Sequence, residues 1–166
     1  QGEHMKALTS LVNQALAWLT ITISTVLVGC VVWQVLSRYV LGAPSTVTDE
    51  MARFLFMWVG LLGAAYATGL KRHLAIDLLT MRLTGKRKAC SELLVQLAVA
   101  GFAAVIMVYG GLGLVNKTLS TGQISPALGL PMGYVYLCLP ISGMGILFYC
   151  VVDSLDKLKT LTSPAA

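Results

Sequence analysis

Four long apolar segments, separated by short polar ones, dominate the pattern of hydrophobic and polar positions along this chain. No Lys, Arg, His, Asp or Glu occurs within residues 7–37, 54–70, 93–116 or 118–152. A helix needs about 20 predominantly apolar residues to cross a bilayer. The pattern therefore predicts an all-α integral membrane protein with four spans, at about residues 16–36, 54–70, 93–115 and 132–152.

The composition agrees with this fold class. Of the 166 residues, 57% are hydrophobic and 11% are charged, whereas a soluble domain averages about 25% charged residues. A soluble fold of this size could not bury so much apolar surface, which excludes a soluble enzyme and a secreted disulfide scaffold. The net charge of +5 does not indicate nucleic acid binding, because the basic residues cluster beside the predicted spans.

The segment before the first span fits two structures. Residues 6–15 place Leu8, Leu11 and Val12 on one helical face and polar residues on the other, as in an interfacial amphipathic helix. One long tilted helix that continues into the span fits equally well. Residues 1–4 resemble a purification-tag remnant, so we expect the native chain to begin at Met5 and residues 5–166 to form one membrane domain.

Lys and Arg are distributed unequally between the two ends of the predicted spans. With a cytoplasmic N-terminus, nine lie on the cytoplasmic side, and only Arg38, Arg53 and Lys117 lie on the other. The positive-inside rule therefore predicts that both termini are cytoplasmic. On that side, residues 71–92 are expected to form a cytoplasmic loop that contains a short surface helix, which ends near Gly85.

Local signals mark the remaining connections. The outer connections, at residues 38–48 and 116–131, are rich in Gly, Pro, Ser and Thr. Thr46 followed three residues later by Asp49 resembles a capping box at the start of the second span. Pro140 is expected to bend the fourth span.

The predicted spans lack the residues that chemistry within a membrane requires. Pumps and transporters place ionisable side chains at membrane depth, and haem proteins place histidines there. The four cysteines cannot be paired by their spacing, so we expect free thiols. We therefore expect no enzyme, no cofactor, no metal and no independent transport.

Small residues gather in the second and third spans, among them Gly60, Gly63, Ala64 and Ala104. Small side chains let helix backbones approach closely in a lipid environment. They serve either packing within a four-helix bundle or packing against another membrane protein, and the second use is favoured.

Several motifs occur in a distinctive order along the chain. They are the run from Arg38 to Gly42, Asp49 and Glu50 with Arg53, Trp58 and Gly63, His73 with Asp77, and the stretch 125–131. Together they resemble the small membrane subunit of tripartite ATP-independent periplasmic (TRAP) transporters, the DctQ-like family.

The resemblance implies a role in the bacterial inner membrane. The small subunit would be a scaffold for a large membrane subunit, which holds the sodium and substrate sites for organic-acid symport. A periplasmic binding protein would deliver the substrate. The alternative is a stand-alone four-helix protein that transports or conducts by self-oligomerising.

The charged motif residues have alternative roles. Glu50 and Arg53 are three apart on one helix face, so they can pair with each other, or bind a lipid phosphate or a charge on a partner. His73 and Asp77 share a face and make a poor metal site, which favours a structural pair.

The remaining motif residues also have more than one reading. Trp58, like the other tryptophans, serves either as an interface anchor or in packing. Arg38, Lys117 and Pro126 are expected to help dock the binding protein, the alternative being that the basic side chains meet lipid headgroups and the loops only connect helices.

Overall fold

The structure is a computed structural model that describes residues 2–70 and 86–162. It contains the helices α1 (Gly2–Tyr39), α2 (Thr46–Gly69), α4 (Lys86–Phe102), α5 (Gly111–Ser120), α6 (Met132–Tyr136) and α7 (Cys138–Thr162), and the π-helix η1 (Ala103–Gly110). Within the described chain, four helical segments are long and apolar enough to cross a membrane: Ala7–Tyr39, Thr46–Gly69, Ser91–Ser120 and Met132–Leu155. The predicted all-α class with four spans is therefore confirmed.

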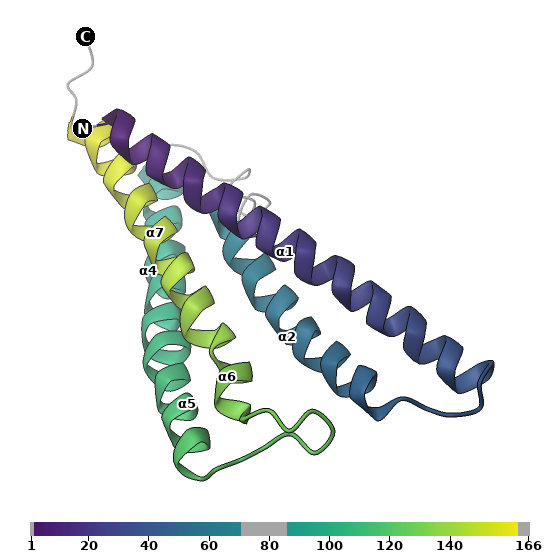
Figure 1. Ribbon diagram of the computed structural model, residues 1–166. Helices are drawn as coiled ribbons and strands as arrows, with labels where there is room; N and C mark the ends of the chain where they lie inside the picture. The colour runs from purple at the N-terminus through teal and green to yellow at the C-terminus, as the bar shows by residue number, and fades with distance from the viewer. Residues whose placement is uncertain (1, 71–85, 163–166) are drawn as a thin grey trace.

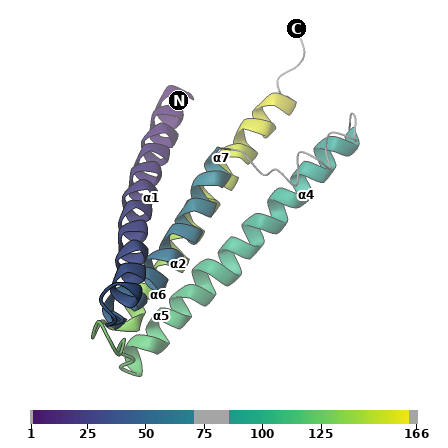
Figure 2. The ribbon, with the colours of Figure 1, turned by 90° about the vertical axis from the view of Figure 1, so that its right-hand side faces the viewer.

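The four spans stand in an open row. The main contacts join α1 to α2, α2 to α7, and α7 to η1 and α4. Figure 2 shows α1 and α4 on opposite sides, with α2 and α7 between them. This arrangement differs from a closed four-helix bundle, in which the outer helices would also meet.

The two ends of the row differ in what they hold. The start of α1 and the end of α7 both lie at one end of the row, here called the terminal end (Figure 1). The α1–α2 and α5–α6 connections lie at the opposite end, here called the loop end. The first residues of α1 and the last residues of α7 are therefore on the same side of the spans.

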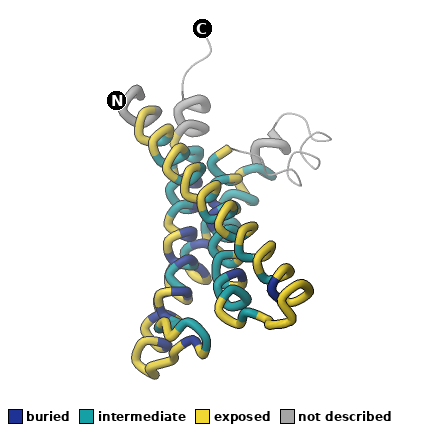
Figure 3. Tube along the Cα trace, turned by 45° about the vertical axis from the view of Figure 1, so that its right-hand side comes forward, coloured by how far each residue is buried: buried dark blue, intermediate teal, exposed yellow. Residues whose placement is uncertain are grey.

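The helix α1 runs without interruption from Gly2 to Tyr39. Of the two structures that fit the N-terminal segment, the single long helix is the one observed. Most of its residues are exposed (Figure 3), including Trp18 and Trp33. An apolar helix with so little burial inside the chain has its remaining surface available to lipid or to another protein.

The core lies where α2, η1 and α7 meet. It is built around Ala65, Ala103, Met107, Ile146 and Cys150. Small residues make this close contact feasible, because backbones approach where side chains are short. The packing of small residues inside the chain, one of the two uses expected for them, is thus observed.

The fourth span is broken in two near its start. Helix α6 ends at Tyr136 and α7 begins at Cys138, as Figure 1 shows. The cause is Pro140, which has no N–H to donate to the Tyr136 carbonyl, and the next regular bond runs from Ile141 N to Leu137 O at 3.2 Å. Where a bend was expected at Pro140, the helix is instead interrupted one turn earlier, at Leu137.

Several predicted boundaries need correction. The N-cap of α2 is Ser45, whose hydroxyl accepts from Thr48 N at 3.5 Å, so the capping box at Thr46 and Asp49 is wrong by one residue. Helix α5 continues to Ser120, which shortens the outer connection. Helix α4 begins at Lys86, inside the segment predicted as a cytoplasmic loop. The rest of that segment, residues 71–85, lies outside the described residues.

The cysteines follow the expectation from spacing. Cys30, Cys138 and Cys150 are free. The Cys30 thiol lies 3.6 Å from the Met51 sulfur, a contact between α1 and α2. The side chain of Cys90 lies outside the described residues.

Candidate functional site

The start of α2 holds two adjacent carboxylates that point to different partners. The Asp49 carboxylate accepts from Gln34 Nε2 at 2.6 Å and from Arg53 Nη2 at 2.6 Å. Gln34 belongs to α1, so Asp49 ties the two helices of the first hairpin together. The pairing of Glu50 with Arg53 that their spacing suggested is not observed, because Arg53 forms its ion pair with Asp49, four residues away.

Glu50 binds the loop between α5 and α6. One carboxylate oxygen, Oε2, accepts from the Ser125 hydroxyl, from Ala127 N at 3.1 Å and from Leu128 N at 3.3 Å. Successive helical residues point about 100° apart, so neighbouring carboxylates can serve different partners. Glu50 therefore joins the first hairpin to the second half of the chain.

The loop bound by Glu50, residues 121–131, is also closed by its own backbone. Ser125 N donates to Leu130 O at 2.8 Å, Gly129 N to Ser125 O at 2.9 Å, and Met132 N to Gln123 O at 2.9 Å. Gly129 has φ +65°, a conformation that glycine adopts without strain. The Ser125 side chain is buried at the centre of this turn.

The residues predicted for docking all lie at the loop end. Arg38 is in the last turn of α1, Lys117 is in α5, and Pro126 is in the loop that Glu50 holds. All three are exposed. Lys117 belongs to a helix, whereas the sequence placed it in a connection.

The four small residues predicted to contact a large subunit sit on the outer surface of the row or at its margin. A Cβ added at Gly60 or Gly63 would meet nothing within 4 Å. Ala64 is exposed and Ala104 is half-buried, whereas their neighbours Ala65 and Ala103 are fully buried. Neighbouring small residues thus divide between internal contacts and open surface.

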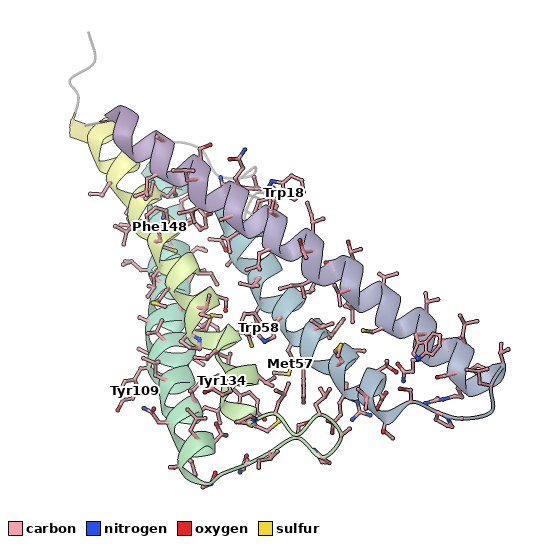
Figure 4. All side chains as sticks on the ribbon, in the orientation of Figure 1. Trp18, Met57, Trp58, Tyr109, Tyr134 and Phe148 are labelled. Atoms are coloured by element: carbon pink, nitrogen blue, oxygen red, sulfur yellow. The ribbon has the colours of Figure 1, made fainter. Side chains whose placement is uncertain are left out.

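The tryptophans differ in their surroundings. Trp58 is half-buried and, with Met57, lies on the side of α2 that faces α6 in Figure 4. Trp18 is an exposed residue of α1. His73 and Asp77 lie outside the described residues.

Two further contacts were also not expected from the sequence. At the terminal end, the Tyr149 hydroxyl donates to Asn13 Oδ1 at 2.6 Å and joins α7 to α1. Between α4 and α7, Gln96 Nε2 donates to the Cys150 carbonyl at 2.9 Å. The sequence carried one signal for these contacts, an amide side chain in an apolar segment. Such a group needs a hydrogen-bond partner when it is surrounded by lipid.

In the described ranges, no group of three or more His, Cys, Asp or Glu side chains lies close enough together to hold a metal ion. The polar contacts described above instead join helices or close a loop. They define a small multi-pass membrane protein whose polar side chains hold its own spans in place.

A match to a protein-family model agrees with this class of protein and identifies the family. The model described as "Tripartite ATP-independent periplasmic transporters, DctQ component" matches residues 27–160. The chain belongs to this family, as its motifs suggested.

Two of the similar curated proteins are much longer than this chain. The chain is 33% identical over 118 residues to the isethionate TRAP transporter permease protein DctMQ of Oleidesulfovibrio alaskensis, a match that covers 68% of this chain and 18% of that protein. It is 27% identical over 150 residues to the sialic acid TRAP transporter permease protein SiaT of Haemophilus influenzae, which covers 90% of this chain and 24% of that protein. The chain thus spans less than a quarter of these two relatives.

A third relative has a similar length. The sialic acid TRAP transporter small permease protein SiaQ of Vibrio cholerae is 26% identical over 158 residues, which covers 95% of this chain and 90% of SiaQ. The similarity therefore extends over nearly all of a small permease protein.

Proposed function

We propose that this chain is the small scaffold subunit of a TRAP-type secondary transporter in the bacterial inner membrane, with both termini cytoplasmic. The observation that carries the proposal is the match over 90% of the small permease protein SiaQ. The matches to limited parts of DctMQ and SiaT support a large membrane subunit as the partner, since a related segment there belongs to a longer permease chain.

The composition of the spans supports a scaffold over a carrier. Asp49, Glu50 and Arg53 lie at the loop end of α2, and the apolar part of α2 that follows carries no charged side chain. Sodium and an organic acid need polar or charged ligands at membrane depth. We infer that those sites belong to the large subunit and that this chain performs no catalysis.

The open surface of α2 is proposed as part of the contact with the large subunit. Gly60, Gly63 and Ala64, with Ala104 on η1, would let the backbone of another helix approach closely. Lipid is expected to cover the remaining apolar surface, including much of α1.

The loop end is proposed to help dock the periplasmic binding protein. Arg38 and Lys117 would attract an acidic surface, and this effect weakens as salt rises. Pro126 restricts the backbone of the exposed loop.

Reconstitution into liposomes tests the proposal. The purified chain alone should move no organic acid, whereas the chain with its large subunit and binding protein should support sodium-driven uptake. Uptake by the chain alone would refute the scaffold role and favour a self-oligomerising transporter.

Reversal of Arg38 and Lys117 to Glu tests the docking role. It should slow uptake at limiting binding protein without loss of assembly. Unchanged uptake across a salt series would refute the part of these two residues in docking.

A further inference from the structure

We propose that Glu50 is a positioning residue that clasps the loop 121–131 onto the start of α2, so that the binding protein meets a preformed surface. This inference rests on the proposed docking function. This Glu50 clasp consists of the carboxylate of Glu50, the Ser125 hydroxyl and the N–H groups of Ala127 and Leu128.

The position of the clasp in the fold shows why the contact matters. The only covalent link between α2 and α4 runs through residues 71–85, beyond the C-terminal end of α2. The apolar contact of α2 with α7 includes Ala65, whose Cβ lies 3.5 Å from a Cβ built on Gly145. Glu50 precedes Ala65 by 15 residues, which is about 22 Å along a helix. The clasp therefore joins the two halves of the chain at the loop end of α2, about four helical turns away from the contact of Ala65 with α7.

The donor set of the loop is matched to one carboxylate oxygen. Pro126 has no N–H; Ala127 N donates to Glu50, and Leu128 N is shared between Glu50 Oε2 at 3.3 Å and Ser125 Oγ at 3.3 Å. Ser125 is 1% exposed, so removal of the acceptor would leave its hydroxyl without the partner it has in the folded chain. Buried donors that lose an acceptor favour rearrangement of the segment that carries them.

The clasped loop presents apolar side chains outward. Ile124 is 61% exposed and Leu130 is 47% exposed, with exposed Pro126 between them in sequence. Exposed apolar groups on a fixed backbone suit an interface, because a preordered loop loses less entropy on binding. Arg38 and Lys117, at the same end, would supply attraction at longer range.

Asp49 provides a matched control because it is the adjacent carboxylate. It contacts Gln34 and Arg53, whereas Glu50 contacts the loop. Alanine at either position removes one carboxylate from the same helical turn. Only Glu50→Ala removes the acceptor of the clasp.

The test compares Glu50→Ala with Asp49→Ala in the complete transporter, with the large subunit and the binding protein. In Glu50→Ala, hydrogen exchange at the loop amides should accelerate about tenfold, and the half-saturating concentration of binding protein should rise about tenfold. The maximal uptake rate at saturating binding protein should stay within about twofold of wild type, since docking alone is impaired. Asp49→Ala should leave loop exchange unchanged. Glu50→Gln keeps an acceptor oxygen, so its loop exchange and its half-saturating concentration should both lie between those of wild type and Glu50→Ala.

If Glu50→Ala does not assemble with the large subunit, Ser125→Ala removes one of the three donors instead. It should raise the half-saturating concentration about threefold, with Ser120→Ala as the control. Unchanged loop exchange in Glu50→Ala would overturn the clasp. Faster exchange with an unchanged half-saturating concentration would overturn its role in docking. The variant in which both Arg38 and Lys117 are reversed to Glu distinguishes failure of the clasp from failure of the proposed docking function. If docking at the loop end is wrong, uptake by this variant should also be unchanged. If only the clasp is wrong, uptake by this variant should still be slowed.

Discussion

The substitution Gly143→Ala tests whether close packing of small residues holds the row of helices together. A Cβ added at Gly143 would lie 2.7 Å from Met107 Cβ and 3.0 Å from Val108 Cγ2. Carbon atoms pack at about 3.5–4.0 Å. Because Met107 Cβ is fixed to the backbone, it cannot turn aside, and α7 must move away from η1 by about 1 Å.

The expected magnitude follows from two opposing effects. Overpacking a close contact costs about 1–3 kcal/mol. Replacing glycine inside a helix gains about 0.5–1 kcal/mol. A matched control is Gly63→Ala, because a Cβ there meets nothing within 4 Å and only the gain applies. The difference between the two variants therefore isolates the packing cost, about 1–3 kcal/mol.

Thermal unfolding of the purified chain in detergent measures this difference. For a chain of this size each kcal/mol shifts Tm by about 2–4 °C, so Gly143→Ala should unfold about 2–12 °C below Gly63→Ala. Equal Tm values for the two variants would refute the close contact between α7 and η1.

Further predictions concern the partner surface, the terminal end and the helix break. Gly63→Leu should not lower Tm of the isolated chain but should reduce co-purification with the large subunit, at a cost of about 1–3 kcal/mol; wild-type yield would exclude this position from the interface. Tyr149→Phe should lower the unfolding free energy by about 0.5–1.5 kcal/mol, and Asn13→Ala should add little to it, because the two share one hydrogen bond; additive losses would contradict that contact. Pro140→Ala supplies the N–H that the Tyr136 carbonyl lacks, so the distance between spin labels on either side of the break should increase, and an unchanged distance would assign the break to another cause.

The sequence predicts the spans because their signal is local. Each span is a stretch without charge, and length alone identifies it. The break near Pro140 follows in the same way from one missing N–H. The cap of α2 was misplaced because Ser45 and Thr46 are adjacent and both suit an N-cap, so spacing alone could not choose between them.

The partners of polar residues could not be predicted with the same success. Spacing along one helix suggested a Glu50–Arg53 pair, since only neighbours on the same helix are visible in a local pattern. The acceptor of Ser125 lies 75 residues earlier in the chain, and only the packing of α2 near the loop brings the two together. Asn13 and Tyr149 are separated by 136 residues in the same manner.

The open row gives a physical reason for the proposed supporting role. A transport path requires polar groups that face a shared cavity between spans. In the described parts of this chain, Asn13 binds Tyr149, Gln34 binds Asp49 and Gln96 binds a carbonyl of α7, so each of these groups is engaged with a neighbouring helix. The broad faces of the row are left mainly apolar, with small residues such as Gly60 and Gly63 open on α2. Such a surface can pack against another membrane protein along its whole height, while the contacts at both ends keep the row in shape.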